Sequence, residues 1–338
     1  MNSRKSSIIL KYNDKKATET ITNDMESFTW VDCASGEADT LSLNLNNRNM
    51  KWFKKGWFPQ KEDVIKASIK VQHWRNQSDN RTVFCGRFAV DECSGTGFPN
   101  TVSISGICVP IRTGFNVTQR NKTYKSTTVK NIMQQIADRA DVKLVFQATD
   151  ISVKEVSQSG KTDMEFAFSL CGDYDLAMKV YNNKLVVYNQ TKYERRKKSF
   201  TLDACDLGEN GSYQFNRSIT KIYDGVKYQY TNGDGDSVTY EYVVPGEKGK
   251  RLLFLSVSAD SHADAERKAR AKLAANLREA VTAEFTLMGD PKYQACQTFT
   301  IKGFGKWNGK YFIDKATHNK SGKYTVSIEC HKCVTNIS

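Results

Sequence analysis

Three residues near the C-terminus have the types and spacing of half a zinc site. Cys330, His331 and Cys333 place two thiols and an imidazole within four positions. A structural zinc ion takes four such ligands, and no second Cys or His pair stands at the separation that zinc sites use. His318 is the nearest further candidate, and it stands alone. We therefore interpret this segment as a strand end with two reduced thiols, and we expect no metal.

Two glycine-containing segments resemble ligand loops but depart from the required spacing. Five residues separate Gly303 from Gly309, whereas a phosphate-binding loop has four, and Tyr311 stands where a magnesium-binding Ser or Thr is needed. The Gly-Asp-Gly-Asp run at 233–236 resembles a calcium loop without its closing Glu. We interpret both as hairpin turns and expect no cofactor.

The histidines give no sign of an enzyme. The chain has four, and none lies in a hydrolase or metalloprotease motif. A Gly-x-Ser-x-Gly nucleophile elbow is also missing from the sequence. We therefore predict that the protein is not an enzyme.

A basic run at residues 192–198 is the first candidate interface. Lys192, Arg195 and Arg196 belong to it, and Tyr188 and Tyr193 are interleaved with the charges. Nucleic-acid-binding surfaces use such residues to hold phosphates and to stack on bases. No nucleic-acid module signature accompanies the run, so we favour a solvated hairpin end between two domains.

An aromatic loop is the second candidate interface. It carries Trp52, Phe53, Trp57 and Phe58 among lysines. Such aromatics either cap the end of a β-barrel or form a contact surface for another subunit. The flanking lysines favour the contact surface.

Length and composition describe an ordinary globular chain with a basic charge. It has 338 residues, 39% hydrophobic and 26% charged, with a net charge of +13. Two or three domains are expected. The nine cysteines are scattered through apolar strands, which predicts buried free thiols. No segment matches a membrane span or a signal peptide, so we expect synthesis in the bacterial cytoplasm.

The hydrophobic pattern divides the chain into three parts. Residues 1–110 alternate with period 2 in several segments, as in Leu41, Leu43 and Leu45, which predicts an antiparallel sheet or barrel. Residues 111–205 carry two helical patterns, capped by Thr127 or Thr128 and by Asp163, and a hairpin with an Asn-Asn turn at 182–183. Residues 206–338 return to strands and include a long helix at 262–281, whose narrow apolar stripe predicts packing against a barrel.

A repeated sequence motif relates the first and third parts of the chain. Gly86 is followed by a basic residue, an aromatic and, after an apolar pair, Asp91; Gly309 begins the same order and ends it at Asp314. A Thr-Val-Ser-Ile segment follows each copy. The glycines are 223 residues apart and the threonines 224. A constant offset is the mark of a duplicated structural unit.

A further set of segments follows in a fixed order along the chain. They are Trp30-Val31-Asp32, Gly36 to Leu41, Asn47 to Trp52, Gly86 to Asp91, Gly97-Phe98-Pro99, the 128–140 helix, the 162–174 segment, 184–187, and Gly289-Asp290-Pro291 through Gly309 to His318. In this order the segments resemble the late control D proteins of phages, which are baseplate hub proteins of contractile tails related in fold to the first part of VgrG spikes.

The resemblance implies a β-rich α+β fold with two tail-tube-like antiparallel β-barrels, at 1–110 and 206–338, and a small α+β domain at 111–205 between them. It implies a homotrimer that joins a sixfold tail tube to a threefold central spike, with baseplate wedge and tape-measure proteins as further partners. The particle would be a phage tail, an R-type bacteriocin or a related injection device. Nucleic acid would only pass through the lumen, and no stable membrane insertion is expected.

Two alternatives from other classes stay open. A basic nucleic-acid-binding protein would use the run at 192–198. A component of a cell-wall hydrolase would need a catalytic constellation, and the sequence shows none.

Overall fold

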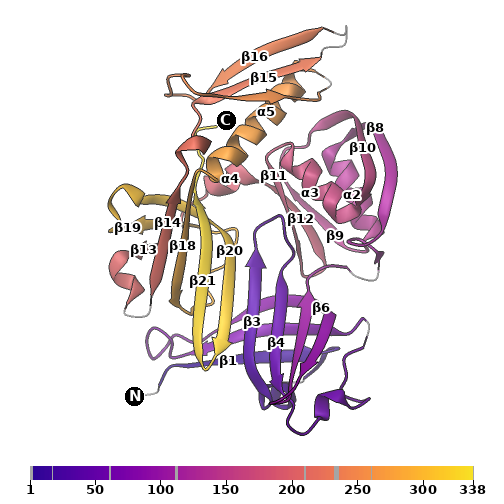
Figure 1. Ribbon diagram of the computed structural model, residues 1–338, viewed down its shortest axis with the longest axis vertical. Helices are drawn as coiled ribbons and strands as arrows, with labels where there is room; N and C mark the ends of the chain where they lie inside the picture. The colour runs from indigo at the N-terminus through magenta and orange to yellow at the C-terminus, as the bar shows by residue number, and fades with distance from the viewer. Residues whose placement is uncertain are drawn as a thin grey trace.

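A computed structural model of the chain describes residues 3–16, 18–60, 62–110, 113–208, 211–231, 236–259 and 261–337. Strands dominate the described residues, which confirms the predicted β-rich α+β class. Figure 1 shows two β units in the lower half of the view and two smaller modules above them. Among the described helices, none combines the length and apolar character needed to cross a membrane. The expected turn at 233–235 lies outside the described residues.

The first β unit contains six main strands in the order β3-β4-β7-β6-β5-β1. Buried residues alternate with more exposed ones along β5 and β7, as the period-2 pattern predicted, because one face of each strand covers a core that includes Phe28, Trp30 and Phe88. Short elements β2 (Lys15–Lys16), α1 (Thr18–Thr22) and η1 (Lys51–Phe53) lie between the strands. The strands are β1 (Lys5–Tyr12), β3 (Met25–Cys33), β4 (Thr40–Asn46), β5 (Val64–Gln72), β6 (Arg81–Thr96) and β7 (Thr101–Ile107).

The second β unit repeats the same strand order, β14-β18-β21-β20-β19-β13. Its core includes Phe285, Phe299 and Tyr311. One pairing differs: β13 runs parallel to β19, whereas β1 runs antiparallel to β5. Its strands are β13 (Phe200–Asp203), β14 (Ser212–Arg217), β18 (Val281–Met288), β19 (Thr298–Lys302), β20 (Gly309–Ser321) and β21 (Lys323–Lys332), and η3 (Ala204–Leu207), η4 (Ile219–Lys221) and η5 (Gly305–Trp307) are short turns of 3-10 helix.

The predicted duplication is confirmed at the level of the backbone. Gly86 and Gly309 both have a positive φ, 149° and 147°. The motif aspartates, Asp91 and Asp314, fall where the ladders β6–β7 and β20–β21 each slip by one residue, at a β-bulge. Beyond the bulge the two ladders keep equivalent registers, since Glu92 pairs with Ser105 and Lys315 pairs with Glu329. The glycine and the aspartate of the motif therefore mark a special φ and a bulge at the same place in each unit.

The two units are joined edge to edge, which the sequence did not predict. The second half of β20 pairs antiparallel with β3, from Lys315 opposite Cys33 to Lys320 opposite Phe28. This joint merges both units into one 13-stranded sheet. Within the described residues, the outer strands of each unit are not paired with each other, so each unit is a curved, partly open barrel. In Figure 1 β1 crosses behind β3 and β4.

The middle module lies between the units in sequence. Helices α2 and α3 pack with the two sheets β10-β8 and β11-β12-β9 around one apolar core. Thr128 caps α2, as predicted, by accepting a hydrogen bond from the backbone N of Asn131. The predicted Asn-Asn turn is confirmed, since both residues have positive φ. The elements are β8 (Gln119–Thr128), α2 (Val129–Arg139), β9 (Lys143–Gln147), β10 (Ser152–Thr162), α3 (Asp163–Gly172), β11 (Leu176–Tyr181), β12 (Lys184–Asn189) and α4 (Gln190–Glu194).

The cap predicted for α3 was wrong by one residue. Thr162 is the N-cap and forms a capping box with Glu165, which satisfies two backbone donors at once. Asp163 is the first helical residue, and its buried carboxylate instead binds Arg139 and Arg120, with Nη2 of Arg139 at 2.7 Å.

An inserted module follows β14 and corrects the expected extent of the second sheet. Its strands β15 (Gly225–Thr231), β16 (Ser237–Val243) and β17 (Leu252–Ser256) form a separate sheet in the order β16-β15-β17. Helix α5 (His262–Arg278) ends three residues before the predicted boundary. Its stripe of Ala265, Ala269 and Leu273 packs on this small sheet rather than on a barrel, because Val226 and Tyr228 of β15 share its core. Figure 1 shows α5 beneath the sheet.

Candidate assembly site

The first tryptophan of the aromatic loop belongs to the core. Trp52 is 3% exposed and lies in the core of the first β unit. Its indole N donates to Asp24 Oδ2 at 3.1 Å. Lys51 forms an ion pair with the same carboxylate at 2.6 Å, and its ammonium lies 4.2 Å from the ring centre of Trp57. Trp52 therefore anchors the loop and is not available as a contact surface.

The other three aromatics of the loop reach solvent. Phe53, Trp57 and Phe58 are 44%, 39% and 45% exposed. The ring of Phe53 lies over Gly95 of β6, where an added Cβ would approach it to 2.6 Å. This exposed aromatic patch of Phe53, Trp57 and Phe58 stays a candidate interface.

The basic run is partly engaged by the chain itself. Arg195 donates to the carbonyl oxygens of Thr335 and Ile337 at 2.9 and 3.1 Å. The guanidinium of Arg196 lies 3.2 Å from the ring centre of Tyr193. Lys192 is exposed on α4. The structure does not bring this run to the aromatic loop: Figure 1 shows α4 near the centre of the molecule and the loop at its lower end.

A buried ion cluster joins both β units to the middle module. The ammonium of Lys179 on β11 donates to Asp32, to Asp39 at 2.9 Å and to the carbonyl of Cys33 at 2.7 Å. The other oxygen of Asp32 accepts from the backbone N of Ala295 in the second unit, at 2.8 Å. A small apolar cluster with members from all three parts lies at the same junction: Ala34, Ala177, Tyr188, Tyr193, Ala295 and Phe312.

Burial controls the charge states in this cluster. Burial raises the pKa of Asp39 to about 7, against the opposing attraction of Lys179. The pKa of Lys179 lies above its usual range, because the neighbouring Asp32 and Asp39 outweigh the cost of burying its charge. Lys179 is therefore an ammonium throughout the neutral range and acts as a fixed link.

A second buried cluster links the end of α5 to the second β unit. Arg278 Nε binds Glu194 Oε1 at 2.5 Å, and its Nη2 binds Asp175 Oδ1 at 2.7 Å. His331 lies between two carboxylates, with Nε2 at 3.3 Å from Glu194 and Nδ1 at 2.8 Å from Asp314. Burial opposes charging of His331, but these carboxylates prevail and raise its pKa to about 9.

Protein groups surround His331 and Cys330 of the Cys-x-x-Cys segment. Nδ1 of His331 hydrogen-bonds to Asp314 at 2.8 Å, and Nε2 lies at ion-pair distance from Glu194, 3.3 Å. The thiol of Cys330 is buried and donates to the carbonyl of Ala283 at 3.2 Å. Within the described ranges, no group of three or more His, Cys, Asp or Glu side chains is arranged to hold a metal ion.

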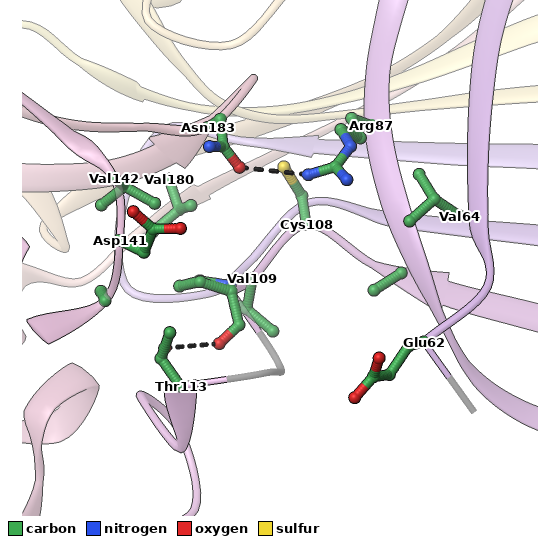
Figure 2. A pocket seen from close by; sticks show the side chains of 13 residues that line it. Glu62, Val64, Arg87, Cys108, Val109, Thr113, Asp141, Val142, Val180 and Asn183 are labelled. Carbon is green, nitrogen blue, oxygen red and sulfur yellow. Dashed lines mark hydrogen bonds between the residues drawn. The ribbon is translucent and has the colours of Figure 1, made fainter. Parts of the chain in front are cut away.

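A pocket lies where the first β unit meets the middle module (Figure 2). Arg87 and Asn183 approach each other across it, and their side chains hydrogen-bond at 3.1 Å. Burial raises the pKa of the Cys108 thiol on its wall to about 12, so this thiol stays protonated and is a poor nucleophile. Arg87 and Asn183 act here as a bridge between the two parts.

No family model and no curated protein matches this sequence. Solved structures do match over nearly the whole chain. The tail protein from Neisseria meningitidis is 13% identical, has a TM-score of 0.71, and covers 98% of this chain and 99% of its own. The 43 kDa tail protein of prophage MuSo2 from Shewanella oneidensis is 13% identical, with a TM-score of 0.69, and covers 97% and 98%.

An Escherichia coli protein described as a component of the type VI secretion system is 10% identical, with a TM-score of 0.58 over 93% of this chain and 75% of its own. That protein is itself structurally similar to bacteriophage T4 tail proteins. The class is therefore defined by the fold: this chain has the fold of phage tail proteins and of related secretion-system components. The fold expected from the late control D resemblance is confirmed.

Sequence reasoning missed both ion clusters. Asp32 belongs to the Trp30-Val31-Asp32 segment, but its partners Lys179 and Ala295 are far away in the chain. A charged residue at a buried strand position, such as Asp32 in an apolar stretch of β3, was the only available signal.

Proposed function

We propose that this protein is the structural hub of a contractile tail, a homotrimer that joins the tail tube to the central spike. The observation that carries the proposal is the internal duplication within a tail-protein fold: one chain contains two β units with the same strand order and the same bulged motif. Three copies would supply six similar units. Such a ring can meet a sixfold tube on one side and a threefold spike on the other.

The buried ion clusters suit a mechanical role. The Lys179 cluster and the Arg278 cluster fix the modules to the β units, so a pull on one part is transmitted to the others. We propose that the protein makes or breaks no bond itself. Wedge and tape-measure proteins would then be neighbours in a phage tail or a tail-like particle, and the exposed aromatic patch would be one contact surface.

The mass of the full chain in solution tests this proposal, alone and with its tube and spike partners. A trimer is expected at least in the presence of the partners. A chain that stays monomeric with both partners present would contradict the hub function.

Nucleic-acid binding through the basic run is the weaker alternative. Arg195 and Arg196 are engaged within the chain, which leaves fewer free cations than the sequence suggested. Nucleic-acid binding that falls steeply with salt and with neutralisation of the basic run at 192–198 would favour this alternative over the hub.

A further inference from the structure

Both β units have strand edges without a partner among the described residues, and two of these edges, on β6 and β14, fit each other. In the first unit, β6 pairs with β5 only up to Ala89, so its edge over residues 92–96 has β7 on one side and no strand on the other. In the second unit, β14 pairs only with β18. All residues of β14 are exposed except Phe215, which is half-buried. Unpaired edges present rows of backbone donors and acceptors that favour strand addition.

The joint inside the chain shows how these two edges fit each other. Lys315 onward in β20 corresponds to Glu92 onward in β6, because both stretches follow the motif bulge. The internal partner of this β20 stretch is β3.

The strand of the second unit equivalent to β3 is β14. Ile104 and Ile328 are equivalent, because each ends a copy of the Thr-Val-Ser-Ile segment. Leu43 of β4 lies opposite Ile104, and Phe285 of β18 lies opposite Ile328. On their other side, Phe28 of β3 pairs with Leu43, and Tyr213 of β14 pairs with Phe285. The joint β20–β3 is therefore a template for a joint between β6 and β14.

We infer that β6 of one copy pairs antiparallel with β14 of the next copy, with Cys93 opposite Arg217 and Ser94 opposite Asn216. This register follows from the joint inside the chain. There Ala316 lies opposite Asp32, which corresponds to Cys93 opposite Arg217, and Thr317 lies opposite Val31, which corresponds to Ser94 opposite Asn216. The two edges of one chain belong to different β units, so the contact is head-to-tail, and with the proposed three copies it would close into a ring. The inference rests on the proposed trimer for the number of copies and names the surface that builds it.

The side chains along the two edges are compatible with this joint. Ser94, Thr96 and Asn216 are small or polar and exposed, so they can lie on an outer face without clash. Asp91 is exposed at the bulge, and exposed Arg217 would lie on the same face of the joint with the opposite charge. Tyr213, 55% exposed in the single chain, would lie opposite Gly97 at the end of the joint.

A paired-cysteine experiment tests the register. The backbone N of Ala34 donates to the carbonyl of Asp314 at 2.7 Å, and hydrogen-bonded pairs alternate with non-bonded ones. The Thr317–Val31 pair is therefore a non-bonded one, in which side chains lie closest. Its counterpart in the new joint is Ser94–Asn216, and directly opposed Cβ atoms about 4.5–5.5 Å apart come close to disulfide geometry.

The full-length double variant S94C/N216C is expected to give a covalent trimer under mild oxidation, reversed by reductant, on non-reducing gels. The matched control is S94C/S212C, whose second cysteine lies four residues, about 13 Å, farther along β14. The control and both single variants should show less than a tenth of this product.

Each other outcome overturns the inference in a distinguishable way. A trimer by mass that gives no S94C/N216C link leaves the proposed trimer standing and refutes the β6–β14 joint. Equal linking by the control refutes the register. A chain that is monomeric by mass with its partners present removes the trimer as well as the joint.

Discussion

Lys179→Met should release the middle module from the β units. The substitution removes the only ammonium that contacts both Asp32 and Asp39 in the described structure, and it keeps a long apolar side chain. The three side chains are 12%, 8% and 0% exposed, so water cannot replace the lost cation. Breaking one partner of such a buried cluster costs about 3–5 kcal/mol, because an uncompensated charge remains.

The structure also predicts how this loss depends on pH. Since the pKa of Asp39 is about 7, this carboxyl is protonated below neutral pH, and its neutral form is no longer attracted by the charge of Lys179. The loss on Lys179→Met should therefore be larger at pH 8 than at pH 6. Adding Asp39→Asn to the variant should restore about 1–3 kcal/mol at pH 8, since one buried charge disappears.

Urea unfolding followed by circular dichroism, with limited proteolysis of the middle module, measures this effect. The first unfolding transition is the relevant one, because a chain of several modules need not unfold in one step. Lys184→Met is the matched control: this lysine is exposed on the neighbouring strand β12, and a change within about 0.5 kcal/mol is expected. A loss below about 1 kcal/mol for Lys179→Met at pH 8 would refute the reasoning.

Three further predictions follow from single sites. The pKa of His331 is about 9 in the folded protein and 6.5 in the unfolded chain, so the stability that its charge contributes is complete below pH 6.5 and is lost as the pH rises to 9. His331→Gln should remove this pH dependence of the unfolding free energy, which amounts to up to about 3 kcal/mol. Unfolding measured from pH 6.5 to 9 checks the prediction. Gly86→Ala should lower the unfolding free energy by about 1–3 kcal/mol, because φ is +149° and the new Cβ would lie 3.0 Å from a ring carbon of Phe88. The control Gly56→Ala places its Cβ in open space and should change the unfolding free energy by less than about 0.5 kcal/mol. Phe58→Ser should leave the unfolding free energy nearly unchanged and weaken co-purification with other tail components, since the ring is 45% exposed.

Distinct results would contradict each of these. An unaltered alkaline slope in the His331 variant would show that this imidazole is not held charged by its carboxylates. Equal losses for the two glycine variants would remove the backbone argument for the repeated motif. Phe58→Ser that assembles normally, or that unfolds the free chain, would exclude the aromatic patch as an assembly surface.

The sequence predicted the pieces of the fold better than their arrangement. Alternation identified the strands and their buried faces, and the repeated Gly-to-Asp phrase identified the duplication, because both signals are local. Alternation does not say which strand lies alongside, so the β20–β3 joint, between residues about 290 positions apart, was not foreseen. The small sheet that packs on α5 was assigned to the wrong core for the same reason.

The candidate site shows the same limit. Exposure divided the aromatic loop, with Trp52 in the core and Phe58 outside, although both looked alike in the sequence. The ion cluster around Lys179 depends on contacts among three distant segments, and spacing carries no signal for it.

The mass of the native full-length chain, measured with its tube and spike partners by native mass spectrometry, tests the central claim most directly. One chain has a mass of 38.2 kDa. The account predicts that this protein is present as three copies, about 115 kDa, in every complex that contains it. Complexes that contain a single copy would contradict it.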